Sequence, residues 1–340
     1  LILWLNFRKY CKMMNFRTPV ERPERKVDML HSDRLLVLGS CFAENIGNLL
    51  KENKFRCDVN PFGVLYNPLS IAKALLQILE GKVYETDDLF ESKGMWHSWM
   101  HHSSFSSDIS ADDCLCRIND RLKSASEELP QIDWLVMTWG TSYVYKYEDE
   151  VVGNCHKQPD AFFKRQHVSV EMIVCEWTNI LRRLKERTPK LKVLFTVSPI
   201  RHAKDGMHGN QLSKATLLLA IDELCRKNDN CYYFPSYEIL LDELRDYRFY
   251  ADDMIHPSTL AINYIWECFV ETYFGKETKR ILGEWHEIQN ALRHRPFKPS
   301  SETYQKFLCQ IMLRINRMKE NLPYLDIQNE IELCQSLLKK

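Results

Sequence analysis

The stretch "RLLVLGSCFAENIGNLL", residues 34–50, predicts how the fold begins. Its aliphatic residues, 35–38, form a run typical of a buried strand, and Gly39-Ser40-Cys41 interrupts that run. The following residues are amphipathic at helical spacing, with apolar side chains at Phe42, Ile46, Leu49 and Leu50. We therefore expect a strand that turns directly into a helix, with a hydroxyl and a thiol side by side at the corner.

Further aliphatic runs predict that this strand belongs to a parallel sheet. Buried strands are indicated at 134–140 and 191–199, a shorter one at 231–236, and another at 55–63 that ends in a turn. Helical patterns lie at 42–52, 70–80, 169–187 and 210–227, the last beginning at Asn210 as a cap. Because strands alternate with helices, we expect an α/β fold with a central, mainly parallel sheet.

Two other regions have a different pattern. Residues 81–110 contain "GMWHSWMHHSSFSS", which is rich in His, Ser and aromatic residues without a period, so we expect a long loop that lines a site. From Ile262 onward the pattern is helical, and the turn "RPFKPSS" separates two helical runs. The sequence thus predicts an α/β domain at 15–275 and a C-terminal helical hairpin, appended at 276–340.

Composition excludes some functions. Lys plus Arg total 46 and Asp plus Glu total 46, so no net basic charge indicates nucleic acid as a partner. No uninterrupted apolar stretch is long enough for a transmembrane helix. The apolar start, residues 1–5, is too short for a signal peptide, and we expect the true start at Met13 or Met14.

Cysteine usage predicts a reducing compartment. Twelve cysteines are scattered through the 340 residues, which favours a cytoplasmic location. Only Cys114 and Cys116 lie close together, and no second pair at zinc-ligand spacing accompanies them. We therefore expect buried thiols, no metal site and no cofactor.

The corner at Gly39-Ser40-Cys41 is suited to nucleophilic chemistry. Ligands of open parallel sheets bind beyond the carboxyl ends of the strands, where this corner falls. The following helix directs its first N–H groups and its positive dipole end to the same point, and these groups could hold an oxyanion. In the alternative interpretation, Ser40 only caps the helix and Cys41 is buried.

A second polar cluster lies near the end of the α/β region. Asp253-Met254-Ile255-His256-Pro257 precedes a helical pattern, and Pro257 suits its first turn. Asp253 and His256 could face one pocket, where the carboxylate would fix the imidazole tautomer and the imidazole would take a proton from a nucleophile. The alternative is a surface turn whose Asp caps the helix.

These two motifs resemble the SGNH/GDSL hydrolases, and several motifs together resemble the GSCFA-domain family more closely. The resemblance covers roughly residues 15–270 and implies a three-layer, SGNH-like α/β fold. It rests on "LGSCFAENIG", "NPFGVLYNP", "TWGTSYVY", "NCHK", "TVSPIRH", "NQLSKATLLLAIDEL" and "FPSYEILLDELRDYRFYADDMIHPS".

The resemblance implies roles for single residues. His256 matches the catalytic base and Asp253 the residue that orients it. Alignment on Gly39 without a gap places Cys41 at the serine position of Gly-Asp-Ser, whereas a shifted alignment makes Ser40 the nucleophile, and both remain open.

The oxyanion hole also has matches. Gly63 matches the oxyanion glycine, so we expect backbone N–H groups at 40–41 and 63 to hold the oxyanion. Gly140-Thr141-Ser142-Tyr143 matches Gly-x-Asn-Asp, with Ser142 in place of the oxyanion Asn. Thr141 or Asn154 could supply the missing hydrogen bond.

Other polar residues are expected near the substrate. Asn154, His156 and Lys157 follow a predicted hairpin at 143–152 that could fold back over the site. Substrate contacts are predicted for His97, His101, His102, His156, Arg201 and His202. A metal site made of three histidines is an alternative, but no carboxylate at ligand spacing supports it.

The function expected from these features is ester hydrolysis through an acyl-enzyme on Ser40 or Cys41. The aromatic residues of the 81–110 loop, Trp96, Trp99 and Phe105, favour a small-molecule or glycan ester, and a carbohydrate O-acyl esterase in particular. One alternative is an O-acyltransferase that resolves the same acyl-enzyme with a glycan hydroxyl. Another is a non-catalytic glycan-binding protein of the same fold, and the C-terminal hairpin could bind a partner in either case.

Overall fold

The centre of the molecule is a parallel sheet. The computed structural model describes residues 17–294, 296–297 and 300–338, so the start expected at Met13 or Met14 lies outside the described residues. Five strands form the sheet in the order β10-β9-β5-β1-β2, and all neighbours are parallel. The strands are β1 (Arg34–Gly39), β2 (Arg56–Val59), β5 (Trp134–Trp139), β9 (Lys192–Val197) and β10 (Cys231–Phe234), as the sequence predicts.

The strand order places a binding crevice beside β1. From β1 the chain goes first to β2 on one side, and it then returns to β5 on the other side. The order therefore reverses between β1 and β5, and ligands of open α/β sheets bind outside the strand ends at such a reversal. The Gly39-Ser40-Cys41 corner follows β1 at this point.

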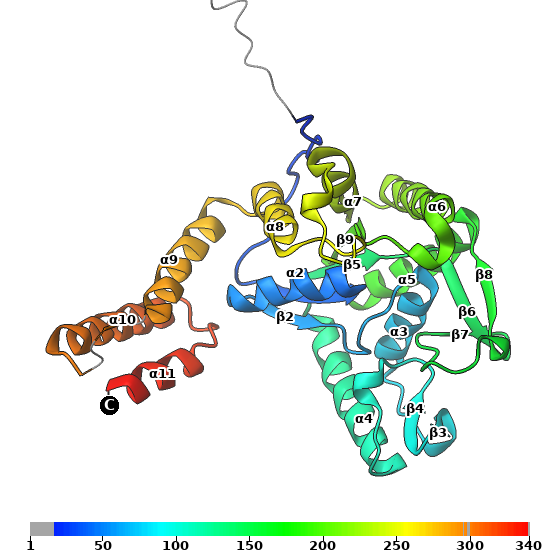
Figure 1. Cartoon of the computed structure of the whole chain (residues 1–340), viewed down its shortest axis with the longest axis horizontal. Helices are drawn as coiled ribbons and strands as arrows, with labels where there is room; N and C mark the ends of the chain where they lie inside the picture. The colour runs from blue at the N-terminus through cyan, green and yellow to red at the C-terminus, as the bar shows by residue number, and fades with distance from the viewer. Residues whose placement is uncertain (1–16, 295, 298–299, 339–340) are drawn as a thin grey trace, which may run out of the picture.

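Helices cover both faces of the sheet and give three layers (Figure 1). Alternate residues of β1 point to opposite faces, so that Leu36 and Leu38 belong to one apolar core and Leu35 and Val37 to the other. The first core is completed by α3 (Pro68–Glu80), α4 (Ala111–Glu128), α5 (Val170–Arg187) and α6 (Gly206–Lys227). The second is completed by α2 (Cys41–Glu52), the π-helix η6 (Ile239–Leu244) and α8 (Thr259–Tyr273), whereas Tyr237 of the short α7 (Ser236–Glu238) belongs to the first.

The segment expected as a long loop contains a hairpin, so that expectation is wrong in part. Strands β3 (Leu89–Ser92) and β4 (Met95–Ser98) pair antiparallel. Lys93 and Gly94 both have positive φ, 54° and 74°, which is the geometry of a tight two-residue hairpin turn. The sequence signal is weak here because only Gly94 favours that geometry.

A second small sheet lies beyond the carboxyl end of β5. Its strands β6 (Tyr143–Tyr147), β7 (Glu150–Val152) and β8 (Lys164–His167) are antiparallel in the order β7-β6-β8. The hairpin predicted at 143–152 is therefore confirmed.

Short 3₁₀ helices lie between the larger elements: η1 (Thr86–Asp88), η2 (Ser103–Phe105), η3 (Leu129–Gln131), η4 (Asp160–Phe162), η5 (Ala203–Asp205) and η7 (Tyr247–Phe249).

Two predicted helix starts need correction. Helix α6 begins at Gly206, before Asn210, and the Asn210 side chain accepts a hydrogen bond from the His202 N–H at 3.0 Å instead of capping the helix. Helix α8 begins at Thr259, and Ser258 is its N-cap because its hydroxyl accepts from the Ala261 N–H. Pro257 therefore precedes the cap rather than occupying the first turn.

The C-terminal extension has one helix more than the predicted hairpin. Helices α9 (Lys276–Arg293), α10 (Glu302–Asn321) and α11 (Gln328–Leu338) enclose an apolar core of their own, to one side of the sheet (Figure 1). Trp285 of α9 donates a hydrogen bond from Nε1 to the carbonyl oxygen of Glu52 at 2.8 Å, at the last residue of α2. Across the described ranges, none of the helices combines the length and hydropathy of a membrane-spanning segment.

Candidate active site

The corner after β1 is a tight bend that only glycine fits. Gly39 has φ +140°, and a Cβ at this position would lie 2.2 Å from the carbonyl oxygen of Thr138. Ser40 follows as the N-cap of α2, because its Oγ accepts a hydrogen bond from the Phe42 N–H at 3.3 Å. An Oγ that accepts in this way keeps its own proton free to donate. The capping role and a nucleophilic role are therefore compatible.

Asp253 and His256 form the expected pair. His256 Nδ1 lies 2.6 Å from Asp253 Oδ2, and Oδ1 accepts the N–H groups of Ile255 and His256, each at 2.9 Å. The N–H groups of His256 and Ile255, followed by the imidazole, lower the pKa of Asp253 to about 2. An ionised Asp253 accepts the Nδ1 proton, and this bond fixes Nε2 as the ring nitrogen that can take a proton from a nucleophile.

A backbone contact holds this pair near the sheet. The Arg201 N–H donates to the Ile255 carbonyl oxygen at 3.2 Å, and the Ala251 N–H donates to that of His256 at 2.8 Å. Met254 takes a left-handed conformation, φ 58°, inside the turn. Because Arg201 follows β9, the Asp253–His256 turn is tied to the carboxyl end of the sheet, where β1 also ends.

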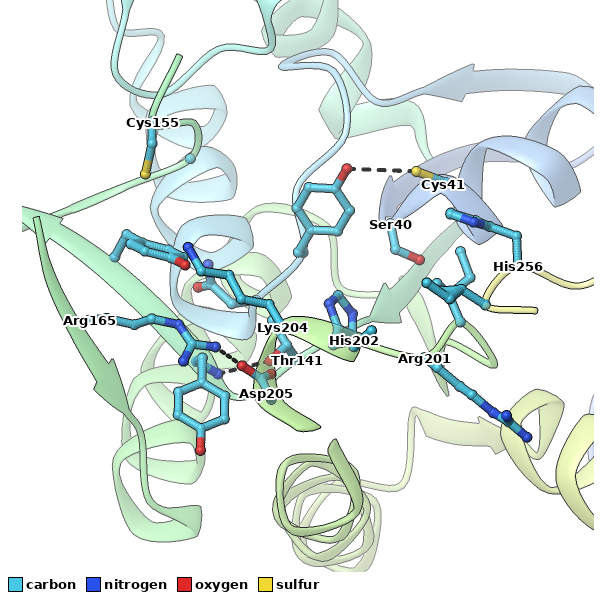
Figure 2. A pocket seen from close by; sticks show the side chains of 18 of the residues that line it. Ser40, Cys41, Thr141, Cys155, Arg165, Arg201, His202, Lys204, Asp205 and His256 are labelled. Carbon is cyan, nitrogen blue, oxygen red and sulfur yellow. Dashed lines mark hydrogen bonds and ion pairs between the residues drawn. The ribbon is translucent and has the colours of Figure 1, made fainter. Parts of the chain in front are cut away.

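One cavity of about 420 Å³ joins the two motifs. Ser40 and Cys41 line it together with His256, although most of the chain separates them in sequence (Figure 2). In this view the Ser40 hydroxyl and the Cys41 thiol lie on the same side of the cavity as His256, and the thiol is turned toward the Tyr66 hydroxyl, 3.7 Å away. The cavity also has room for a small ester or one sugar ring.

Tyr66 is a site residue that the sequence did not single out. Its hydroxyl lies 3.7 Å from Cys41 Sγ and its ring lines the cavity. Burial, followed by the neighbouring Cys41, raises the pKa of Tyr66, so its hydroxyl stays protonated and can donate. The only sequence signal was its place in the motif "NPFGVLYNP", just before Asn67.

Asn67 is a second such residue. Its Oδ1 accepts from the Ser70 N–H at 2.8 Å and caps α3. Its side-chain NH₂ group has no hydrogen-bond partner within the part of the chain that the structure describes, and Asn67 lines the cavity. Asn67 therefore offers a side-chain donor for the hydrogen bond that the sequence assigns to Ser142, Thr141 or Asn154.

Most of the predicted oxyanion donors are already in use. The N–H of Ser40 donates to Thr138 O at 3.2 Å, that of Gly63 to Asn60 O at 2.7 Å, and that of Thr141 to Tyr66 O at 3.0 Å. Among the residues described, the Cys41 N–H, in the first turn of α2, donates to no protein acceptor. Of the two backbone N–H groups at 40 and 41, that of Cys41 therefore remains available to a substrate oxyanion.

The other predicted oxyanion residues are placed differently. Thr141 lines the cavity. Ser142 is fully buried, and both its N–H and its hydroxyl bond to Ser213 Oγ, so it does not face the cavity. Asn154 also lies outside the lining, and its Oδ1 accepts a hydrogen bond from the His156 N–H at 2.8 Å.

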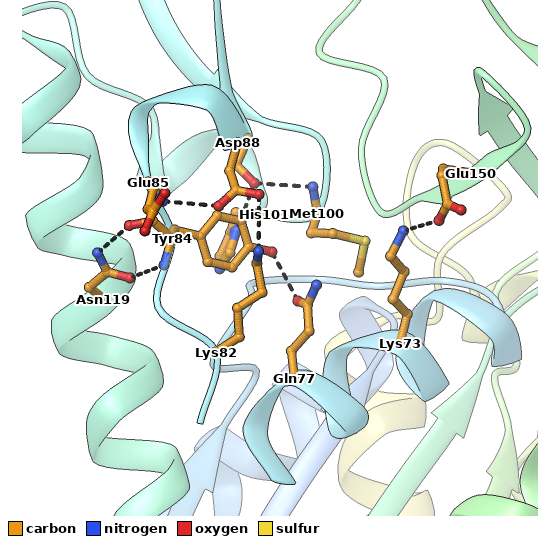
Figure 3. Close-up of polar contacts among 11 residues, drawn as sticks. Lys73, Gln77, Lys82, Tyr84, Glu85, Asp88, Met100, His101, Asn119 and Glu150 are labelled. Atoms are coloured by element: carbon orange, nitrogen blue, oxygen red, sulfur yellow. Dashed lines mark hydrogen bonds and ion pairs between the residues drawn. The ribbon is translucent and has the colours of Figure 1, made fainter. Parts of the chain in front are cut away.

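The expectation that the 81–110 loop lines the site with histidines is not met. His97, His101, His102 and His156 do not line this cavity. His101 is buried and stacks on Phe62, with ring centroids 4.5 Å apart, beside Tyr84 (Figure 3). Burial, followed by His156, lowers the pKa of His101 to about 3, so it is a neutral core residue.

The remaining rings of this region also pack internally. His97 Nδ1 bonds to Ser106 Oγ at 2.6 Å, His156 Nε2 to Ser98 O at 2.8 Å, and His102 caps η2. Of the three aromatic residues offered for the substrate, Trp96, Trp99 and Phe105, none lines this cavity, and the Trp99 ring stacks on that of Phe90 with centroids 3.7 Å apart. No group of His, Cys, Asp and Glu side chains in the described ranges is arranged to hold a metal ion.

Arg201 and His202 line the cavity as predicted from their place after β9. Burial, followed by Lys214 and Arg165, lowers the pKa of His202 to about 3, so His202 is neutral. His202 Nε2 is buried, and no hydrogen-bond partner for it exists in the described residues. We therefore assign His202 to the cavity floor rather than to proton transfer.

The far wall of the cavity was missed by sequence reasoning. It combines aromatic and charged side chains from β6, β8 and η5, namely Tyr143, Tyr145, Arg165, Lys204 and Asp205 (Figure 2). Tyr143 and Tyr145 are two apart on β6 and so share one face. That alternation was the available signal, but it could not show which face meets the cavity.

Comparison with known families agrees with the motifs. Residues 34–269 match the GSCFA family, which covers both the Gly39 corner and the Asp253–His256 turn. The chain belongs to the GSCFA family. Residues 285–340 match the C-terminal domain of GSCFA domain proteins, so the family's second part begins within α9. No curated protein matches this GSCFA chain.

Proposed function

We propose that this GSCFA protein cleaves carboxylic esters through an acyl-enzyme, as SGNH-like hydrolases do. One observation carries the proposal: His256, which is paired with Asp253, lines the same cavity as the Ser40-Cys41 corner at the carboxyl end of the sheet. A nucleophile, a base within the same cavity and a residue that orients the base are the three parts that such chemistry requires.

Ser40 is the preferred nucleophile. Its cap bond with Phe42 holds the oxygen in place, and no dashed contact in Figure 2 joins its hydroxyl to another lining side chain. Cys41 is the alternative, since its thiol also lines the cavity, but that thiol is turned toward Tyr66. Ser40→Ala removes one candidate nucleophile and Cys41→Ala removes the other, so the activities of the two variants distinguish them.

The reaction takes two steps. Ser40 Oγ attacks the ester carbonyl carbon while His256 Nε2 takes the hydroxyl proton, and His256 then gives this proton to the departing alkoxide, which leaves as the alcohol. In the second step water attacks the acyl-enzyme, its proton passes through His256 to Ser40, and the carboxylic acid is released. Asp253 orients the imidazole and stabilises its positive form in both steps.

The developing oxyanion needs donors that are not in use elsewhere. Among the described residues, the Cys41 N–H and the Asn67 side-chain amide fulfil this condition, and the Tyr66 hydroxyl, which contacts the Cys41 thiol at 3.7 Å, is a third donor that lines the cavity. Loss of one oxyanion donor typically costs about 10²–10³ in kcat. No protein-bound metal is part of this mechanism.

A carbohydrate O-acyl ester remains the proposed substrate. Tyr143 and Tyr145 take the place that we had expected for the tryptophans of the 81–110 region, because their rings line the cavity. An O-acyltransferase shares the acyl-enzyme and differs only in the acceptor, for which the same tyrosine wall offers a binding surface. A glycan-binding protein without catalysis is the remaining alternative.

The test is turnover of p-nitrophenyl acetate and of acetylated sugars, with and without free sugar as acceptor. We expect hydrolysis that falls at least about 10³-fold in His256→Ala and in Ser40→Ala, with Cys41→Ala within a few-fold of the wild type. Acetylated acceptor in place of acetate would identify a transferase. Turnover that is equal in the wild type and all three variants would refute the proposal.

A further inference from the structure

We propose that the substrate carries an anionic group, a carboxylate or another oxyanion, which binds at the wall formed by Lys204 and Arg165. This inference rests on the proposed function, because it places the anion in the same cavity as Ser40. It adds a substrate class: esters with a negative charge in either the acyl or the alcohol part.

The first argument is the charge of the cavity. Three cationic side chains line it, those of Arg165, Arg201 and Lys204, against one carboxylate, that of Asp205. The whole chain, by contrast, has no net charge. A cleft lined by one sign of charge concentrates ligands of the opposite sign.

The second argument concerns the single carboxylate. The Asp205 side chain is only 2% exposed and pairs with Arg165. Asp205 lines the cavity but is committed to Arg165, so it does not cancel the charge of Lys204. Within the described residues, Arg201 has no carboxylate partner, and its guanidinium lies over the rings of Tyr250 and Tyr247.

The third argument is that the cations are held in place. Arg165 lies over the Tyr143 ring at 4.0 Å from the centroid, and Lys204 over the Tyr145 ring at 5.3 Å. These contacts restrict the cations and leave the charge of Lys204 in place, whereas Arg165 shares its charge with Asp205. The carboxylate near Lys204 is Asp160, at 3.5 Å, but this side chain is 84% exposed and lies outside the cavity lining.

The arrangement has a clear polarity. Ser40 and His256 lie at one side of the cavity, and Lys204 and Arg165 lie at the other (Figure 2). Apolar side chains of the same lining, including Ile200 and Val152, accompany them. An ester whose carbonyl lies at Ser40 and whose anionic group lies across the cavity contacts both the nucleophile and the cations. Hydrogen bonds from charged, pre-positioned donors to an oxyanion are stronger than those from neutral donors.

The experiment compares matched esters. One pair is p-nitrophenyl acetate and 3-carboxy-4-nitrophenyl acetate, which places the charge in the alcohol part. The other is p-nitrophenyl butyrate and p-nitrophenyl hemisuccinate, which places it in the acyl part. We expect kcat/KM for the charged member of at least one pair to exceed that of its neutral counterpart by about tenfold, and this ratio to shrink as salt is raised.

A matched lysine gives the control. In Lys204→Gln we expect kcat/KM for the preferred charged ester to fall about fivefold while that for the neutral ester stays within twofold. Lys164 lies on β8 near Arg165, is 74% exposed and does not line the cavity. Lys164→Gln is therefore expected to leave both values unchanged.

A binding arm separates this inference from the proposed function. The amide analogue 5-acetamido-2-nitrobenzoate cannot be turned over as an ester, and its binding is measured by calorimetry beside uncharged 4-nitroacetanilide. Preferential binding of the anion, lost in Lys204→Gln and kept in Lys164→Gln, supports the inference even if no ester is cleaved. Equal affinity for the two analogues, or equal kcat/KM for charged and neutral esters, overturns it and leaves ester cleavage itself untouched.

Discussion

The Nζ atom of Lys214 lies 2.6 Å from the carbonyl oxygen of Gly140, although Lys214 is buried inside the GSCFA domain. The same Nζ donates to the Ser198 carbonyl oxygen at 2.7 Å. These two carbonyl groups follow β5 and β9, one residue before Thr141 and shortly before Arg201. Lys214 therefore bridges the carboxyl ends of two neighbouring strands, close to the cavity residues Thr141 and Arg201.

The first prediction concerns Lys214 and pH. Burial lowers the pKa of Lys214 from 10.5 to about 7, so between these values the unfolded chain binds more protons than the folded protein. The free energy of unfolding that this group contributes must then rise with pH from about 7 to 10.5, by at most about 1.4 kcal/mol per pH unit. Lys214→Met is expected to remove this rise, measured by urea unfolding between pH 7 and pH 10.

Lys227→Met is the control for this experiment. Lys227 lies on the same helix, α6, but is exposed and pairs with Glu223. Its substitution is expected to leave the pH dependence of unfolding unchanged. If wild type and Lys214→Met showed the same dependence, the assignment of a burial-lowered pKa to Lys214 would be wrong.

The sheet was predictable because its strands are buried on both faces. Continuous aliphatic runs such as 35–38 identify strands of this kind, and the alternating helices then require parallel pairing. The β3–β4 hairpin escaped because its strands are short and half-exposed, and because Lys93 supplies a positive φ that its residue type does not favour.

The site was predictable only where chemistry and position coincide. Ser40, Cys41, Asp253 and His256 stand at strand or helix ends, and the structure brings all but Asp253 to the cavity lining. The histidines of the 81–110 region misled because a histidine-rich pattern does not show whether the imidazoles face solvent or one another. Lys214 was missed because it lies inside an amphipathic helix, where a lysine normally marks the solvent face.

The second prediction concerns Gly39. Gly39→Ala would place a Cβ 2.2 Å from the Thr138 oxygen at a φ of +140°, so we expect the free energy of unfolding to fall by about 3 kcal/mol or more. Gly283→Ala is the matched substitution, since no atom lies within 4 Å of its Cβ position in the middle of α9. It is expected to stabilise by about 0.5–1 kcal/mol. Equal effects of the two substitutions in urea unfolding would contradict the geometry of the corner.

The third prediction concerns Asp253. In Asp253→Asn an amide replaces the carboxylate that accepts the His256 Nδ1 proton, so the imidazole loses both its fixed tautomer and its stabilised cation. We expect kcat for ester cleavage to fall about 10²–10⁴-fold with the unfolding midpoint almost unchanged, because Asp253 is exposed. Asp252→Asn, the neighbouring exposed residue, is the control. Similar activity of the two variants would remove Asp253 from the mechanism.

The fourth prediction concerns the contact between the C-terminal helices and α2. Trp285→Ala removes a side chain that is 1% exposed and its bond to Glu52, and is expected to cost about 3–5 kcal/mol of unfolding free energy. Glu330→Gln weakens the largely buried ion pair with Lys54 and is expected to cost about 1.5–3 kcal/mol. If Glu330→Gln were as costly as Trp285→Ala, charge rather than apolar burial would join the two parts.

The most direct test of the account is the position of a covalent adduct. The protein is treated with a fluorophosphonate and digested, and the modified peptide is sequenced by mass spectrometry, with Ser40→Ala, Cys41→Ala and His256→Ala treated in parallel. The account predicts a single phosphonyl group on Ser40, absent in Ser40→Ala, strongly slowed in His256→Ala and retained in Cys41→Ala. Absence of label from residues 40 and 41 in a protein that still cleaves esters would contradict it.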